Sequence, residues 1–331
     1  MSTLTPGKLR GLQQVSDPKG ILTVCAIDHR GSLRHALNPQ NPQAVTYHDM
    51  VTFKFDLCRI LSSYVSAVLL DPEYGAGQAI AARVLPGQTG LLVSLESTGY
   101  IGKATARTTE ILPGWNVNKI KRMGAAAAKI LIYFRYDLTK EAQQQLNLVA
   151  YVAEQCINED IPLFVEAVCY PLQGETKDSP EYLAKKPELV IEAARRLTEL
   201  PIDILKSEFP ADLSYEKDDN KLKTYCQELS RVSRRPWVLL SAGADFDVFR
   251  KEVRIACQNG ASGFMAGRAL WQEAPPIKSR QAREKFLNET TVARIKEIAM
   301  IADEYAIPWY SKMAGEFGDL TLVDEDWYKK Y

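Results

Sequence analysis

The chain has 331 residues, 46% of them hydrophobic, so it is long and apolar enough to bury a large core. Lys and Arg together number 41, and so do Asp and Glu, so the formal net charge is zero. No excess of positive charge therefore favours nucleic acid or an anionic membrane surface as a partner. The start of the chain lacks the apolar core of a signal peptide, and no apolar run approaches a membrane span. These features predict a soluble cytoplasmic protein.

Short apolar runs rich in β-branched residues alternate with longer amphipathic segments along most of the chain. We expect eight strands, at Ile21–Ile27, Ala67–Leu70, Gly90–Leu95, Ala128–Tyr133, Leu163–Val168, Ile202–Lys206, Trp237–Leu240 and Gly263–Met265. Helices are expected between them, most clearly at Glu141–Cys156, Pro187–Thr198, Leu222–Ser233 and Asp245–Asn259.

This alternation of strands and helices determines the expected fold. Repeated strand–helix units predict a parallel sheet, and eight of them close as a (β/α)8 TIM barrel, with an open doubly wound sheet as the second choice. A barrel of this length needs only one domain. We therefore expect a single domain over residues 1–331, with a short N-terminal extension over 1–20 and a C-terminal tail from about 308 to 331.

Polar residues stand at the carboxyl ends of nearly all the expected strands. In (β/α)8 barrels the active site is built at this end of the strands, so these residues are the candidates for function. The alternative is that they are ordinary polar loop residues. The candidates from the first six runs are Asp28, His29 and Arg30 after the first, Glu96 after the third, Lys129 within the fourth, and Glu166 and Lys206 closing apolar stretches in the fifth and sixth.

Lys206 and Glu166 are the most informative pair. A charge in an otherwise buried strand costs several kcal/mol unless it is paired or used. An amine and a carboxylate on successive strands are the groups of a Schiff-base enzyme, in which the amine attacks a carbonyl and the carboxylate moves protons. The alternative is a structural ion pair of Lys206 with Glu166 or with Glu208.

Two further candidates have supporting roles. A lysine attacks a carbonyl only as the neutral amine, and a nearby cation such as Lys129 favours that form. Asp28 is placed to bind or deprotonate a substrate hydroxyl, and its alternative is to cap a helix or turn.

The ends of the seventh and eighth runs are rich in small residues. Ser241, Ala242 and Gly243 follow the seventh run, and Gly267 and Arg268 follow the eighth. Small residues let backbone N–H groups approach a phosphate, and an arginine adds a charge-assisted fork. These segments therefore predict a phosphate site, and the alternative is that the glycines only make tight turns.

The sequence offers little for metal or cofactor chemistry. The histidines His29, His35 and His48 lack the spacing of metal ligands. Gly75-Ala76-Gly77 begins like a dinucleotide fingerprint, but Ile80 stands where its last glycine belongs. We expect no metal and no cofactor, and six reduced thiols in the core at Cys25, Cys58, Cys156, Cys169, Cys226 and Cys257.

Taken together, these segments resemble those of the class I tagatose-1,6-bisphosphate aldolases and the related sulfofructose-phosphate aldolases. The matching motifs occur in order and span roughly residues 20 to 275, which makes the resemblance specific. They are Ala26–Gly31 (AIDHRG), Leu69–Gly75 (LLDPEYG), Glu96–Tyr100 (ESTGY), Ala128–Leu131 (AKIL), Phe164–Glu166 (FVE), Leu205–Glu208 (LKSE), Leu240–Gly243 (LSAG) and Ala266–Trp271 (AGRALW).

The resemblance implies roles for individual residues. Lys206 would form the imine with Glu166 as its proton-transfer partner, and Asp28 and Lys129 would contact the sugar hydroxyls. The phosphate nearest the carbonyl would be bound around Ser241, Gly243, Gly267 and Arg268. The sequence departs from the family at His29, where glutamine is usual, and at Ser207-Glu208-Phe209. His29 and Arg30 are the residues expected at the distal phosphate or sulfonate.

We therefore expect a lyase that reversibly cleaves a ketose 1,6-bisphosphate, tagatose 1,6-bisphosphate first and fructose 1,6-bisphosphate second, to dihydroxyacetone phosphate and glyceraldehyde 3-phosphate. Its only expected partner is the sugar phosphate. One alternative is an aldolase for another ketose 1-phosphate, such as 6-deoxy-6-sulfofructose 1-phosphate. A more distant alternative is a sugar-phosphate-sensing regulator. The C4 stereospecificity and any homo-oligomer are left open.

Overall fold

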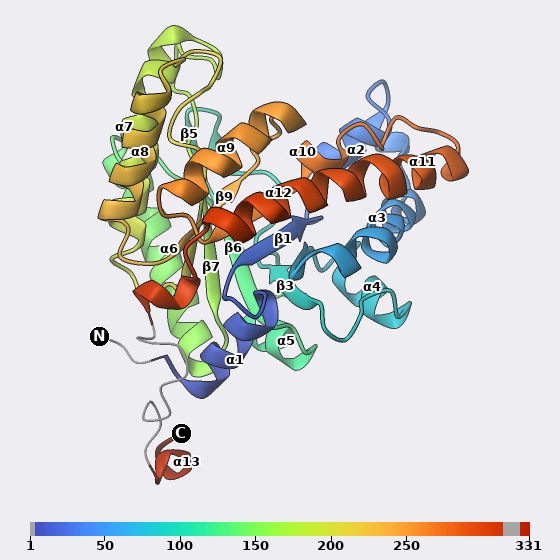
Figure 1. Ribbon diagram of the computed structural model, residues 1–331, viewed down its shortest axis with the longest axis horizontal. Helices are drawn as coiled ribbons and strands as arrows, with labels where there is room; N and C mark the ends of the chain where they lie inside the picture. Colours follow the sequence, from blue (N-terminus) through green and yellow to red (C-terminus); the bar gives the residue numbers. More distant parts are fainter. Residues whose placement is uncertain (1–3, 314–324) are drawn as a thin grey trace.

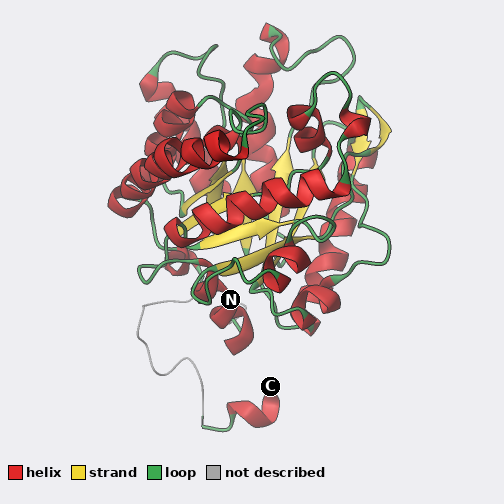
Figure 2. Cartoon of the chain, turned by 90° about the vertical axis from the view of Figure 1, so that its right-hand side faces the viewer, coloured by secondary structure: helices red, strands yellow, loops and turns green. Residues whose placement is uncertain are grey.

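The computed structural model describes residues 4–313 and 325–331. Eight parallel strands form a closed barrel in the order β1-β10-β9-β8-β7-β6-β3-β2, and helices surround it (Figures 1 and 2). The predicted (β/α)8 fold is confirmed, because every expected run supplies one barrel strand. The bounds are β1 Leu22–Ala26, β2 Ala67–Leu70, β3 Gly90–Ser94, β6 Ala127–Tyr133, β7 Leu163–Val168, β8 Ile204–Ser207, β9 Trp237–Leu240 and β10 Gly263–Ala266.

The helices differ widely in length, from single turns to the long α6 and α7. The α-helices are α1 Pro6–Val15, α2 Gly31–Leu37, α3 Tyr47–Leu61, α4 Ala76–Ala81, α5 Val117–Arg122, α6 Thr139–Asn158, α7 Pro180–Leu197, α8 Asp219–Val232, α9 Phe246–Gln258, α10 Arg268–Trp271, α11 Arg280–Phe286, α12 Val292–Tyr305 and α13 Trp327–Lys330. Within the described residues, none is both long and apolar enough to cross a membrane.

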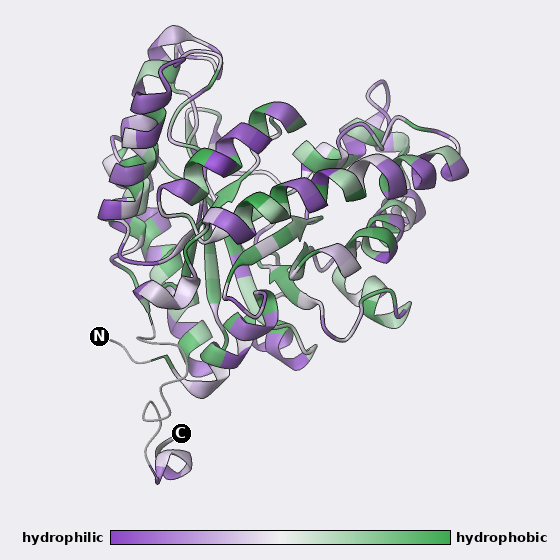
Figure 3. Cartoon of the chain, in the orientation of Figure 1, coloured by the Kyte–Doolittle hydropathy of each residue, from purple (hydrophilic) through white to green (hydrophobic). Residues whose placement is uncertain are grey.

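Apolar residues fill the inside of the barrel and the layer between its strands and helices. Leu22, Leu69, Phe164 and Met265 belong to the inner cluster, whereas Cys25 belongs to the outer layer. Because both faces of these strands are covered, each strand appears in the sequence as a continuous apolar run. Figure 3 shows the hydrophobic strands and the hydrophilic outer faces of the helices. All six cysteines are buried.

Helix α1 covers the amino-terminal end of the barrel. Leu12 and Val15 join the inner apolar cluster, and Gly11 packs so closely that a Cβ there would lie 2.4 Å from the Ala126 carbonyl oxygen. The predicted N-terminal extension thus contains a helix that packs on the barrel. The predicted C-terminal tail falls partly on residues 314–324, which lie outside the described residues.

One predicted helix boundary is wrong. Helix α7 begins at Pro180 rather than at Pro187, which lies inside the helix. The Ser179 side chain caps the start by accepting a hydrogen bond from the Tyr182 N–H, and proline suits the first helical position because it lacks the N–H that would be unsatisfied there. The other three predicted helices start and end within three residues of α6, α8 and α9.

A short antiparallel hairpin interrupts the connection from β3 to α5. It comprises β4 Ile101–Lys103 and β5 Ala106–Thr108, with Ile101 opposite Thr108. The hairpin, at the upper right in Figure 2, was not predicted from the sequence. It brings residues of this connection to the carboxyl-terminal end of the barrel.

Candidate active site

A cavity of about 470 Å³ opens at the carboxyl ends of the barrel strands. It brings together residues from both halves of the sequence. Every site residue that the sequence predicted lines this cavity, namely Asp28, His29, Arg30, Lys129, Glu166, Lys206, Ser241, Ala242, Gly243, Gly267 and Arg268.

Lys206 and Glu166 face each other across neighbouring strands. They are register partners in the parallel pair β7–β8, so their side chains project from the same face of the sheet. The Lys206 Nζ lies 2.9 Å from the Glu166 Oε2, and both residues are buried except where they meet the cavity. The expected pair therefore exists, and it lies on the wall of a cavity large enough for a substrate.

Lys129 occupies the centre of a buried charge cluster. Its Nζ lies 2.7 Å from the Glu166 Oε2, 2.9 Å from the Asp28 Oδ2 and 2.6 Å from the Glu96 Oε1. Burial alone would lower the pKa of Lys129, but the surrounding carboxylates raise it well above its usual value. Lys129 is therefore a permanent ammonium ion at neutral pH.

The carboxylates around Lys129 are correspondingly held in their ionised form. Burial alone would raise the pKa of Asp28, but Lys129 and Lys206 together bring it below the ordinary value. The same two ammonium groups outweigh burial at Glu166 and lower its pKa as well. Both groups are therefore proton acceptors at neutral pH, and each can return a proton once the local charges change.

Glu96 belongs to this cluster although the sequence gave it no role. Its Oε1 binds the Lys129 ammonium and its Oε2 accepts a hydrogen bond of 3.0 Å from the Leu131 N–H. With both oxygens engaged, Glu96 holds Lys129 in place. Its position directly after an apolar run was the available signal, the same one that identified Asp28.

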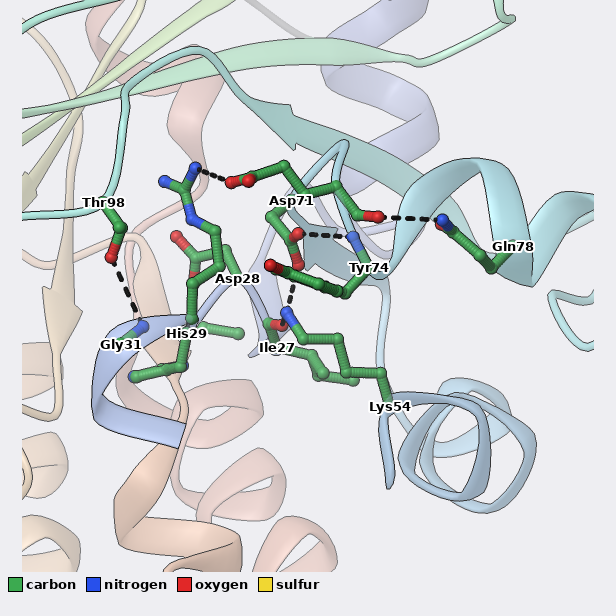
Figure 4. A network of polar contacts seen from close by, with 12 residues as sticks. Ile27, Asp28, His29, Gly31, Lys54, Asp71, Tyr74, Gln78 and Thr98 are labelled. Carbon is green, nitrogen blue, oxygen red and sulfur yellow. Dashed lines mark hydrogen bonds and ion pairs between the residues drawn. The ribbon is translucent and has the colours of Figure 1, made fainter. Parts of the chain in front are cut away.

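A second ion pair fixes the backbone next to Asp28. Lys54 of α3 donates a hydrogen bond of 2.7 Å to the Ile27 carbonyl and pairs with Asp71, at the end of β2 (Figure 4). The other Asp71 oxygen accepts from the Tyr74 N–H at 2.8 Å. The Leu69–Gly75 motif (LLDPEYG), one of the segments of the family resemblance, therefore braces the loop that carries Asp28.

Arg30 and His29 lie in different surroundings from those expected. The Arg30 guanidinium donates to the Glu73 carboxylate at 2.8 Å and to the Glu96 carbonyl at 2.6 Å, so both of its amino groups are already bound to the protein. The His29 ring packs edge-on against Trp271, with 5.0 Å between centroids. Burial, despite nearby Asp28, lowers the pKa of His29 to about 3 and leaves the ring neutral.

The predicted phosphate site is a pair of tight turns around a partly buried cation, Arg268. Ala242 and Gly243 have φ values of 47° and 84°, in the left-handed region. A Cβ on Gly243 would lie 3.0 Å from the Arg268 guanidinium carbon, so glycine makes room for this side chain. The Gly267 N–H lies 3.3 Å from the Ser241 Oγ. Among the described residues, no carboxylate pairs with Arg268, which leaves its charge available for an anion.

Similarity to known proteins agrees with this geometry. The sequence pattern of the DeoC/LacD family of aldolases matches residues 22–273. The tagatose 1,6-diphosphate aldolase of Lactococcus lactis subsp. lactis is 31% identical over 327 residues, which cover 94% of this chain and 99% of the relative. That of Listeria monocytogenes serotype 4a is 30% identical over 342 residues, covering 98% and 100%.

Solved structures show the same fold. An archaeal fructose 1,6-bisphosphate aldolase superimposes with a TM-score of 0.58 at 18% identity, covering 88% of this chain and 97% of that one. The fructose-bisphosphate aldolase of Slackia heliotrinireducens gives 0.62 at 15% identity, covering 92% and 93%. The fold and the charged cavity are those of a barrel enzyme, and the chain belongs to the DeoC/LacD family of aldolases.

Proposed function

We propose that this aldolase uses Lys206 as a Schiff-base nucleophile to cleave a ketose 1,6-bisphosphate, tagatose 1,6-bisphosphate first and fructose 1,6-bisphosphate second. The products are dihydroxyacetone phosphate and glyceraldehyde 3-phosphate. The observation that carries the proposal is the Lys206–Glu166 pair, 2.9 Å apart on the cavity wall. The relatives named as tagatose 1,6-diphosphate aldolases support the choice of substrate.

Imine formation begins with a proton transfer along this pair. Glu166 takes a proton from Lys206, and the neutral amine adds to the C2 carbonyl of the ketose. The resulting carbinolamine loses water as Glu166 returns the proton to the departing hydroxyl. Lys129 stays charged throughout, so it stabilises the ionised carboxylate between proton transfers.

Cleavage then follows the electron demand of the protonated imine. A base removes the C4 hydroxyl proton, the C4–O bond becomes a carbonyl, and the C3–C4 electrons pass into the imine to give an enamine. Asp28 and Glu166, both ionised and both facing the cavity, are the candidate bases. After the aldehyde leaves, protonation at C3 and addition of water release dihydroxyacetone phosphate and regenerate Lys206.

The turns after β9 and β10 are proposed to hold the C1 phosphate. Strand β9 pairs with β8, which carries Lys206, and β10 pairs with β9. An anion held there by Arg268 and the backbone N–H groups of the 241–243 turn would therefore place C2, one carbon away from the phosphate ester, beside the lysine.

An assay with three substrates tests this proposal. The purified protein, after exhaustive chelation of metals, should cleave tagatose and fructose 1,6-bisphosphates to the two triose phosphates, because no step requires a metal. Faster cleavage of 6-deoxy-6-sulfofructose 1-phosphate would assign the enzyme to sulfo-sugars instead. Binding of all three without cleavage would indicate a sensor, for which the Lys206–Glu166 pair would have no use.

A further inference from the structure

The side of the cavity opposite Arg268 contains a cation that the site described above does not use. Arg107 lies in β5 of the hairpin and lines the cavity. Its guanidinium carbon lies 4.6 Å from the ring centroid of Tyr100, 5.1 Å from that of Tyr170 and 5.7 Å from that of Tyr133. Its Nε donates to the Ala104 carbonyl at 2.8 Å. Three rings and one hydrogen bond thus hold the guanidinium in a fixed place.

Arg107 resembles Arg268, and differs from three other cations of the cavity, in its lack of a counter-ion. Lys129, Lys206 and Arg30 are each paired with a carboxylate. Within the described residues, no carboxylate lies within 4.0 Å of the Arg107 guanidinium, and neither terminal amino group donates to the protein. A cation held over aromatic faces keeps its in-plane donors free, and guanidinium suits the bidentate binding of an oxyanion.

The order of the strands places Arg107 opposite the proposed C1 phosphate site. In the closed order β1-β10-β9-β8-β7-β6-β3-β2, strand β6 lies across the barrel from β10. Tyr133 ends β6 and contacts Arg107, whereas Arg268 follows β10. Lys206 on β8 lies between them. His29 is on the side of Arg268, because a Cβ on Gly267 would lie 2.6 Å from its ring.

We propose that Arg107, held by its three tyrosines, binds the distal anion of the substrate and sets the preference for substrates with an anion at both ends. This inference rests on the proposed function, since it assumes a ketose phosphate that extends across the mouth from Arg268. It replaces His29 and Arg30 as the distal site, because the Arg30 amino groups are already bound and His29 packs beside Gly267.

Binding of substrate analogues that cannot react tests the inference separately from catalysis. Hexitol 1,6-bisphosphate and hexitol 1-phosphate have no carbonyl, so calorimetric titration measures recognition of the distal phosphate even if the protein forms no imine. Wild-type protein should bind the bisphosphate roughly ten- to a hundredfold more tightly, the usual worth of a charge-assisted contact. Arg107→Ala should abolish this preference, while its affinity for hexitol 1-phosphate stays within about twofold.

Two matched variants complete the test. Lys103 is an exposed cation on the other strand of the same hairpin and does not line the cavity, so Lys103→Ala should keep the preference. Lys177 is an exposed cation that does line it, but no described side chain fixes its place. The assignment would be overturned if Lys177→Ala lost the preference for the bisphosphate and Arg107→Ala kept it. Equal weakening of both ligands by Arg107→Ala would overturn it too, because the residue would then only support the hairpin.

Discussion

Asp203 and Lys206 stand at opposite ends of one short strand run, and both are almost fully buried charges. At the amino-terminal end, Asp203 pairs with Lys8 of α1 at 2.8 Å and accepts a hydrogen bond of 2.8 Å from the Leu163 N–H. At the carboxyl-terminal end, Lys206 pairs with Glu166 at 2.9 Å, and both side chains face the cavity. The N···O distances of the two ion pairs are similar, but their surroundings differ.

The comparison shows that an ion pair takes its role from what it faces. A buried charge needs a partner at either end, because losing water costs several kcal/mol per ion. Helix α1 covers the Asp203 pair, so that pair can only hold the helix to the barrel. The Lys206 pair borders a cavity of about 470 Å³. A substrate in that cavity can take the place of the Glu166 carboxylate as the partner of the Lys206 amine.

Replacing the lysine at the open end should remove activity and leave the fold intact. Lys206→Met should lower kcat by at least about 10⁴-fold, because no other group can form the covalent intermediate. Glu166 keeps its contact with Lys129, so the free energy of unfolding should change by less than about 1 kcal/mol. Steady-state kinetics and urea unfolding measure the two effects. A folded variant with residual activity above a hundredth of wild type would show that another residue is the nucleophile.

The carboxylate of the same pair should matter next. Glu166→Gln should lower kcat by about 10² to 10⁴, the usual worth of general acid–base catalysis. Lys129 retains Asp28 and Glu96, so the cluster should hold its structure. Circular dichroism provides the control for folding, and near-normal kcat in a folded variant would remove Glu166 from the mechanism.

The closed end should respond in the opposite manner. Lys8→Met leaves Asp203 buried without its cation, which should lower the free energy of unfolding by about 3 to 5 kcal/mol. The folded fraction of this variant should keep the wild-type kcat, because Lys8 lies at the other end of the barrel from the cavity. Denaturant titration and kinetics under folding conditions check both parts. A large fall in kcat at unchanged stability would contradict the division of roles.

The charged groups at the two ends of the barrel should also affect stability at acid pH in different ways. The pKa of Asp28 is lowered in the folded protein, so its stabilising effect is present above the unfolded value near 4 and is lost as the pH falls through the folded value. Burial raises the pKa of Asp203 despite Lys8, so between its unfolded and folded values stability falls as the pH rises.

Asp28→Asn should therefore reduce the acid-induced loss of stability, by up to about 1.4 kcal/mol per pH unit below pH 4. Asp203→Asn should change the slope of stability against pH in the opposite sense, just above pH 4. Urea unfolding between pH 2 and pH 6 measures both slopes. The same sign of change in both variants would show that the two carboxylates are not held in opposite ways.

The sequence contained most of the fold because each barrel strand is covered on both faces. Continuous apolar runs identified all eight strands. The charged residues within these runs or directly after them identified Lys206, Glu166, Lys129 and Asp28. The start of α7 was missed because Pro187 suggested the first residue of a helix. The residue that caps the helix is Ser179, seven residues before the cap position that a start at Pro187 would require.

Side-chain direction and loop structure were harder to infer. Arg30 was assigned to the distal anion because it follows the first apolar run and because the family resemblance placed that anion there. Its guanidinium instead donates to Glu73 and to the Glu96 carbonyl. Arg107 was overlooked because the hairpin that carries it has no periodic apolar pattern. Its position depends partly on contacts with Tyr133 and Tyr170, which lie far along the chain, and no local sequence signal reports such contacts.

Chemical trapping of the imine tests the central claim most directly. Borohydride added to the enzyme with dihydroxyacetone phosphate should reduce an imine to a stable three-carbon phosphate adduct. Peptide mass spectrometry should locate that adduct on Lys206, and Lys206→Met should show none. An adduct on Lys129 or another lysine, or no adduct in an enzyme that turns over, would contradict the assignment of Lys206 as the nucleophile.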